Sequence, residues 1–143
     1  MKPTPFHPFS METAKQKIKQ AEDAWNTKCP TNVLSHFSIH SKWHKGPLLI
    51  KGHEAIEVYL KDKWKNEDCF LLKLEYWAHT DMSIAVQLAY EFRDEDQLWY
   101  RAFGNEIWEF DKTGLIHNRF IRVNDFPIEE EERQLHLEHV SFS

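Results

Sequence analysis

The second half of the chain carries three long runs of β-branched and aromatic residues, in which apolar and polar positions alternate. The runs cover residues 83–92, 98–110 and 115–125, and polar breaks at 93–97 and 111–114 separate them. Runs of this composition, bounded by turn residues, are typical of β-strands. The pattern therefore predicts an antiparallel meander, preceded by one more long strand at about 69–79.

The first half of the chain shows helical periodicity instead. Apolar residues recur at intervals of four, three and four along a helix that ends near residue 28: Ala14, Ile18, Ala21 and Trp25. We expect two more helices at about 32–36 and 53–66, and a short strand at 41–44. Helices followed by long strands indicate an α+β fold, with three N-terminal helices packed on a curved, mostly antiparallel sheet.

The length of 143 residues suits a single domain. We expect its core at about 10–128 and an acidic tail at 129–143, which forms a solvated helix or a frayed end. A net charge of −5 argues against nucleic acid as a partner. No stretch approaches the roughly 18 apolar residues that a membrane helix needs, so we expect no membrane contact and a cytoplasmic protein.

The lengths of the two breaks set the expected pairing of the strands. Across the first break we expect the pairs Phe92–Tyr100, Tyr90–Ala102, Leu88–Gly104 and Ile84–Trp108. Across the second break we expect the pairs Phe110–Leu115, Trp108–His117, Glu106–Arg119 and Gly104–Ile121. Because side chains alternate between the faces of a strand, both registers place the same set of residues on one face.

That face is mostly apolar with a few polar groups, as a ligand cavity requires. A one-residue slip would exchange the two faces. Trp43 of the short strand and Tyr59 of the third helix complete the expected lining. The sheet itself is expected to contribute Leu88, Tyr100, Gly104, Trp108, His117 and Ile121.

Glu106, Arg119 and Tyr90 are the candidate catalytic residues on this face. Opposite charges in an apolar cavity are costly unless they are paired, so one interpretation is a structural ion pair. In the other, Glu106 transfers a proton, Arg119 orients an anionic or carbonyl-bearing ligand, and Tyr90 donates to a developing oxyanion. For the tyrosine, aromatic lining is an equally good interpretation.

The sequence predicts neither a cofactor nor a metal site. It contains no phosphate-binding loop, dinucleotide-binding fingerprint or nucleophile elbow. His40 and His44 are four residues apart in a segment that we expect to enter a strand, where this spacing does not converge on one ion. Zinc needs three or four convergent ligands.

Several blocks of the sequence resemble a known family. They include Ala21-Glu22-Asp23-Ala24-Trp25-Asn26, Gly52-His53-Glu54-Ala55-Ile56, Gly104-Asn105-Glu106-x-Trp108-Glu109-Phe110 and Asn124-Asp125-x-Pro127-Ile128. The chain resembles uncharacterised SnoaL-like (polyketide-cyclase-like) proteins of the nuclear transport factor 2-like superfamily, over about residues 10–135. The family pattern has an acid and an arginine near His40 and His44, where this chain departs from it.

The resemblance implies a cone-shaped fold, a single domain of this type and a homodimer joined through the back of the sheet. The residues expected at that interface are Gln87, Glu91, Arg101, Asn105 and Phe120. Without a dimer, Gln87 opposite Asn105 and Glu91 opposite Arg101 would be ordinary cross-strand pairs, worth about 0.2–1 kcal/mol each.

Three functions fit these observations. The first is a cofactor-independent lyase, isomerase or hydrolase that uses acid–base groups in the cavity. The second is a non-catalytic protein that binds a small hydrophobic or anionic ligand, and the third is a protein-interaction module. An unpaired acid in the cavity would favour the first, and Glu106 locked to Arg119 would favour the second. A filled interior with an exposed apolar patch would favour the third.

Overall fold

The computed structural model describes residues 8–135, and helices precede the long strands along the chain. The elements in order are α1 (Met11–Asn26), α2 (Pro30–Leu34), β1 (Phe37–Lys45), β2 (Leu48–Lys51), α3 (His53–Asn66), β3 (Asp68–His79), β4 (Ser83–Arg93), β5 (Trp99–Phe110), β6 (Ile116–Ile128) and the 3₁₀ helix η1 (Glu130–Glu132). The predicted α+β class is confirmed.

The six strands form one sheet in the order β2-β1-β6-β5-β4-β3. β1 runs parallel to β6, and all other neighbouring pairs are antiparallel. The first strand is longer than expected and makes a hairpin with β2, a strand that was not predicted. Pairing between β1 and β6 ends at Lys45 and Ile121, so within the described residues the remainder of β6 has a free edge.

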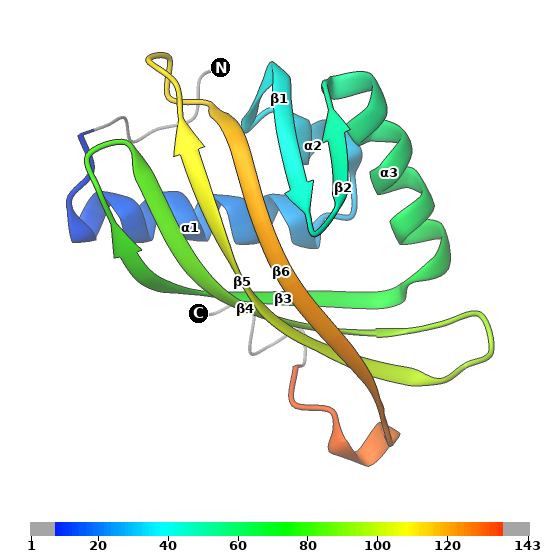
Figure 1. The fold of residues 1–143 in the computed structure, drawn as a ribbon. Coiled ribbons are helices and arrows are strands. Elements are labelled where there is room, and N and C mark those ends of the chain that lie inside the picture. The colour runs from blue at the N-terminus through cyan, green and yellow to red at the C-terminus, as the bar shows by residue number, and fades with distance from the viewer. Residues whose placement is uncertain (1–7, 136–143) are drawn as a thin grey trace.

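The helices lie against one face of the curved sheet, with α1 crossing behind the strands and α3 standing beside β1 and β2 (Figure 1). One apolar cluster joins the helices to this inner face, and its fully buried members include Ala14, Val33, Ile56, Leu60, Ile84 and Val86. Burying one such Val, Leu or Ile side chain contributes about 1.5–3 kcal/mol. No helix within residues 8–135 is long and apolar enough to cross a membrane.

The predicted pairing of β4 with β5 is confirmed, from Phe92 opposite Tyr100 onward. The predicted pairing of β5 with β6 is wrong by two residues for most of its length, because Trp108 pairs with Arg119 rather than His117. Two effects add. The turn is one residue longer, with Phe110 opposite Ile116, and a β-bulge follows directly. A shift of two restores the alternation, so the expected inner face survives.

The longer turn is stabilised by Asp111. Its Oδ1 accepts hydrogen bonds from the backbone N–H groups of Thr113 and Leu115 and from the Thr113 hydroxyl. This is the Asx type of turn that an aspartate readily forms. The bulge that follows leaves His117 without a partner in the ladder.

At Gly104 the backbones of β5 and β6 leave no room for a side chain. A Cβ atom added to Gly104 would lie 1.8 Å from the carbonyl oxygen of Arg122 and 2.8 Å from the Cα of Val123. Any other residue would push the two backbones apart. The glycine is therefore a requirement of strand packing.

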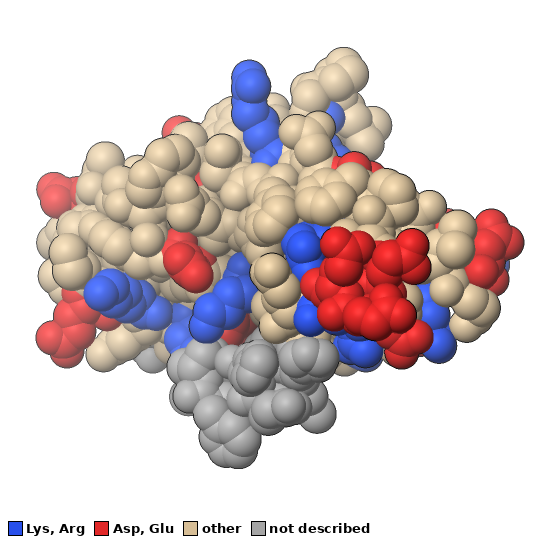
Figure 2. Space-filling model, turned by 90° about the horizontal axis from the view of Figure 1, so that it is seen from below, with Lys and Arg blue, Asp and Glu red and all other residues tan. Residues whose placement is uncertain are grey.

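The acidic tail returns to the outer face of the sheet. The Glu91 carboxylate accepts hydrogen bonds from the backbone N–H groups of Gln134 and Leu135 and from Arg101 Nε, and Arg101 Nη2 donates to the Glu132 carbonyl. The side chains of η1 are exposed, as expected, and Figure 2 shows acidic groups gathered at this end. The backbone up to residue 135 is not frayed; residues 136–143 lie outside the described part.

Lys17 is a buried cation without a hydrogen-bond partner among residues 8–135. Its side chain on α1 is 1% exposed, and its Nζ lies 5.7 Å from the ring centre of Phe110. Burial lowers the pKa of Lys17 from 10.5 to about 8. Burial and the charge of Lys17 lower the pKa of His36 to about 4. At a pH where Lys17 or His36 is protonated in the unfolded chain, burying the group destabilises the folded state.

We expect Lys17→Met to stabilise the protein at pH 7 by about 3 kcal/mol, which is the free energy that corresponds to the lowered pKa. The unfolded chain binds this proton up to about pH 10.5, while the folded chain releases it above about pH 8. The unfolding free energy of the wild type should therefore rise between these values relative to the variant. Urea titrations at pH 7, 9 and 10.5 measure it; a variant that is less stable at pH 7 would contradict the account.

Candidate functional site

A buried ion pair joins β5 to β6 on the inner face. Arg119 Nε donates to Glu106 Oε1 at 2.8 Å, and Arg119 Nη2 donates to Glu106 Oε2 at 2.7 Å. The indole Nε1 of Trp108 donates to the same Oε1 at 2.7 Å. All three residues are at most 5% exposed. This two-pronged geometry fixes the plane of the guanidinium group.

The guanidinium also lies over two tryptophan rings. Its central carbon is 4.3 Å from the ring centre of Trp43 and 4.8 Å from that of Trp25. Such cation–π contacts contribute about 2 kcal/mol when the cation is desolvated. Two nitrogens of Arg119 are occupied by Glu106, while Nη1 has no hydrogen-bond partner among the described residues.

A cavity of about 20 Å³ lies beside this ion pair, between the helices and the sheet. Its walls come from α1, α3 and five strands, and the lining residues are Trp25, Lys45, Tyr59, Lys63, Phe70, Leu72, Leu88, Tyr90, Glu106, Arg119 and Ile121. The walls are mostly apolar, with three cations and one carboxylate. The free volume is close to that needed for a single water molecule.

Two tyrosine hydroxyls are placed to donate hydrogen bonds here. Tyr59 accepts a hydrogen bond from Lys45 Nζ at 3.2 Å, which leaves its own hydrogen free. The Tyr90 hydroxyl has no hydrogen-bond partner among the described residues. Burial, followed by the nearby charge of Glu67, raises the pKa of Tyr90 well above its usual range, so it remains a donor.

Lys63 is the third cation of the lining. Its Nζ lies 4.3 Å from the ring centre of Tyr90 and 2.8 Å from the Glu67 carboxylate. The side chain is 10% exposed. The ammonium group is therefore held in one place by a ring below it and an ion pair beside it.

The structure brings together most of the residues that the sequence analysis placed in the cavity. Those that line it are Tyr59, Leu88, Tyr90, Glu106, Arg119 and Ile121. Trp43 and Trp108 lie behind the lining, where they hold Arg119 and Glu106.

Three expected lining residues lie elsewhere. Tyr100 stacks on Phe92, with ring centres 5.3 Å apart. Gly104 lies against the backbone of β6, where there is no room for a side chain. The β-bulge at His117 removes this residue from the lining, and its buried Nδ1 has no hydrogen-bond partner in the described part of the chain.

Sequence reasoning missed the two lysines of the lining. Lys63 follows Tyr59 by four residues on α3, so it lies on the same helical face, and this spacing was an available signal. Lys45 lies just beyond the short strand expected at 41–44, because the length of β1 was underestimated. Trp25 and the two residues of β3, Phe70 and Leu72, were treated as core or left unassigned.

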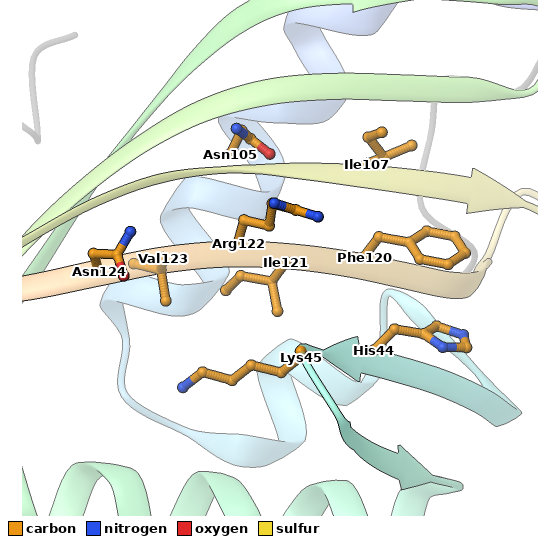
Figure 3. A pocket seen from close by; sticks show the side chains of 10 residues that line it. His44, Lys45, Asn105, Ile107, Phe120, Ile121, Arg122, Val123 and Asn124 are labelled. Carbon is orange, nitrogen blue, oxygen red and sulfur yellow. The ribbon is translucent and has the colours of Figure 1, made fainter.

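A larger groove of about 620 Å³ lies at the free edge of β6. Figure 3 shows its lining, which is His44, Lys45, Gly46, Asn105, Ile107, Phe120, Ile121, Arg122, Val123 and Asn124. His44 stacks on Phe120 with ring centres 4.4 Å apart and shares a hydrogen bond of 3.0 Å with Asn118 Oδ1. Lys45 and Ile121 belong to both the groove and the cavity.

The expected interface residues lie on the outer face of the sheet. Gln87 is opposite Asn105 and Glu91 is opposite Arg101, as predicted. Glu91 is 1% exposed and Arg101 8% exposed, because segment 132–135 of the same chain covers them. Within residues 8–135, no three His, Cys, Asp or Glu side chains are grouped so that they could hold a metal ion.

We expect Glu106→Gln to lower the unfolding free energy by about 3–5 kcal/mol, because it leaves the buried charge of Arg119 uncompensated. Adding Arg119→Met should recover most of this loss. The matched control is Glu57→Gln, which alters an exposed ion pair with Lys61 and should cost less than 1 kcal/mol. Chemical denaturation of the four proteins checks this; equal losses for Glu106→Gln and Glu57→Gln would show that the buried pair is not structural.

Comparisons with known proteins agree with this architecture. No curated protein matches the sequence. The structure superposes on the epoxide hydrolase/cyclase-like enzyme SalBIII of salinomycin pyran-ring formation, with a TM-score of 0.70 and 16% identity, over 79% of this chain and 92% of that chain. An NTF2-like protein of unknown function from Burkholderia pseudomallei gives a TM-score of 0.69 at 11% identity, over 78% and 90% of the two chains.

The BvnE pinacolase of Penicillium brevicompactum gives a TM-score of 0.65 at 12% identity, over 73% of this chain and 81% of that chain. At these identities the likeness shows the fold alone, and it confirms the resemblance to the nuclear transport factor 2-like and SnoaL-like proteins. A family model described as "Protein of unknown function (DUF1348)" matches residues 7–136. The match spans most of the sequence, and the chain therefore belongs to the DUF1348 family.

Proposed function

We propose that this protein binds a small organic anion in the cavity between its helices and its sheet, with Arg119 as the group that receives the anion. One observation carries the proposal. Two guanidinium nitrogens are committed to Glu106, while the third has no partner among the described residues, and the group is already fixed in position. A binding group that is ordered in advance loses little entropy when the ligand arrives.

The other polar groups of the lining support an anion rather than a cation. Three cations line the cavity, Lys45, Lys63 and Arg119, and Glu106 is its single lining carboxylate, while Glu67 pairs with Lys63 from outside the lining. The hydroxyls of Tyr59 and Tyr90 add two donors. The apolar side chains of Phe70, Leu72, Leu88 and Ile121 would contact the organic part of the ligand, as in other small-molecule sites.

In this proposal Glu106 holds Arg119 in place. Its carboxylate has about four acceptor positions, and three are taken by N–H donors. A carboxylate that is bound in this way serves better as an anchor than as a proton carrier. The second of the three functions considered for the sequence, non-catalytic binding, is therefore the one that the geometry favours.

Catalysis is the alternative, and one observation favours it. The fourth acceptor position, on Glu106 Oε2, is free of donors among the described residues. In an enzyme, Glu106 would transfer a proton at this position, Arg119 would fix the charge of the substrate, and Tyr90 would donate to the reacting oxygen. The reaction would belong to the lyase, isomerase or hydrolase classes, and SalBIII and BvnE are enzymes of this fold. Glu106→Gln would then lower turnover by about 10²–10⁴.

The anion proposal can be tested with a matched pair of dyes, anilinonaphthalene sulfonate and the uncharged phenylnaphthylamine. We expect the sulfonate to bind at least about tenfold more tightly. Lys63→Met should raise its dissociation constant several-fold, because a cation of the lining is lost. Lys61→Met, which removes an exposed lysine of the same helix, should have no effect. Fluorescence titration measures both.

Two results would contradict the anion proposal. One is equal affinity for the charged and uncharged dyes. The other is an equal effect of Lys63→Met and Lys61→Met, since binding would then take place away from the cavity.

We also propose a homodimer through the outer face of the sheet. Gln87, Asn105 and Phe120 would form its polar and aromatic centre. The exposed apolar side chains of Phe103, Ile107 and Phe126 on the same strands support it, because patches of this kind mark interfaces. Glu91 and Arg101 would contribute through the segment that covers them.

Light scattering should give twice the 17.2 kDa of one chain at micromolar concentrations. Asn105→Glu should shift the protein toward the monomer, because it places a charge in the centre of the proposed interface, and circular dichroism should show an unchanged fold. The dimer proposal fails if the wild type scatters as a single chain at every accessible concentration.

A further inference from the structure

We infer that Lys45 is the gate of the cavity: its ammonium group, held by the Tyr59 hydroxyl, closes an entrance at the free edge of β6, and an anion enters when this hydrogen bond breaks. The inference rests on the proposed function, because it concerns how an anion reaches Arg119. It names the route and the movable residue, which the binding proposal leaves open.

The entrance is located by the strand pairing. β1 and β6 separate after Lys45 and Ile121, and these two residues line both the small cavity and the large groove. These two residues therefore lie between the two spaces, and we call them the wall. In Figure 3, the Lys45 side chain runs from the end of β1 along β6, past Ile121 and toward Val123.

Only one side of this wall can move easily. Ile121 lies inside the β5–β6 ladder and is 8% exposed. Lys45 is the last residue of its strand, next to Gly46, whose positive φ of 57° begins the turn. A lysine side chain on the end of a strand can change rotamers without disturbing the backbone.

The hold on Lys45 is weak compared with that on the other lysine of the lining. Among the described residues, Lys45 Nζ has one hydrogen bond, to the Tyr59 hydroxyl at 3.2 Å, and no carboxylate within ion-pair distance. Lys63, in contrast, is paired with Glu67 at 2.8 Å. The ammonium group of Lys63 is therefore restrained by an ion pair, whereas that of Lys45 can turn outward by breaking one hydrogen bond.

The dimensions require an opening. The cavity of about 20 Å³ has room for one water molecule, and the groove outside it measures about 620 Å³. An organic anion cannot enter unless part of the wall moves. When Lys45 turns outward it carries a positive charge into the part of the groove lined by Ile121, Val123 and Asn124, where it attracts the anion. The part lined by Asn105, Ile107 and Phe120 belongs to the proposed dimer face. The same movement frees the acceptor side of the Tyr59 hydroxyl.

The test compares binding rates of anilinonaphthalene sulfonate in stopped-flow experiments. Tyr59→Phe removes the acceptor of the Lys45 hydrogen bond and keeps the ring. We expect its association rate constant to rise by about tenfold, as expected for one hydrogen bond of ordinary net strength. In a Lys45→Met background the same substitution should no longer change the association rate, because the hydrogen bond is already absent.

The outcomes separate the gate from the binding proposal. Sulfonate binding that depends on Lys63, together with an unchanged association rate in Tyr59→Phe, overturns the gate alone. A change confined to the dissociation rate also overturns it, since Tyr59 would then be an ordinary contact of the bound anion. If the dye shows no preference for the sulfonate, the binding proposal fails, and the gate fails with it.

Discussion

The ion pair between Glu106 and Arg119 is the interaction on which the inner face of this sheet depends. Two charges buried under the helices are tolerable only because each satisfies the other through two hydrogen bonds and because Trp108 supplies a third donor. The stacking of Trp25 and Trp43 against the guanidinium ties α1 and β1 to the same point. One polar contact therefore links a helix and three strands.

This arrangement constrains function. A fixed arginine with one unoccupied nitrogen, surrounded by aromatic and aliphatic walls, is suited to bind an anion. A carboxylate that accepts three hydrogen bonds is less suited to exchange protons. The near absence of free volume means that binding and side-chain movement are coupled, and Lys45 is the least restrained side chain of the wall.

Much of the fold could be predicted from the sequence, because periodicity and turn residues report on local structure. The helices and long strands follow in the predicted order and the β4–β5 register is confirmed, whereas β2 was not predicted. The β5–β6 register is wrong, because the extra residue in the Asp111 turn and the bulge at His117 each shift the pairing by one residue, and the two shifts together leave the alternation of polar and apolar residues unchanged. Glu106 and Arg119 were still placed together, since two single-residue shifts restore the face.

What could not be predicted depends on contacts between distant parts of the chain. Lys45 reaches the cavity only because β1 pairs with β6 up to that residue. The tail returns to Glu91 through hydrogen bonds from backbone N–H groups. Every residue except proline has such a group, so no sequence pattern predicts this contact. Segment 132–135 thereby buries a pair, Glu91 and Arg101, that the strand pattern alone places at the surface.

The central claim, that Arg119 receives an anion inside the helix-covered face, is tested most directly by a crystal structure of the protein with anilinonaphthalene sulfonate bound. The account predicts the sulfonate within hydrogen-bond distance of Arg119 Nη1, with the Glu106–Arg119 pair intact and the Lys45 side chain turned away from Tyr59. A dye bound on the outer face of the sheet, with the cavity as small as it is here, would contradict it.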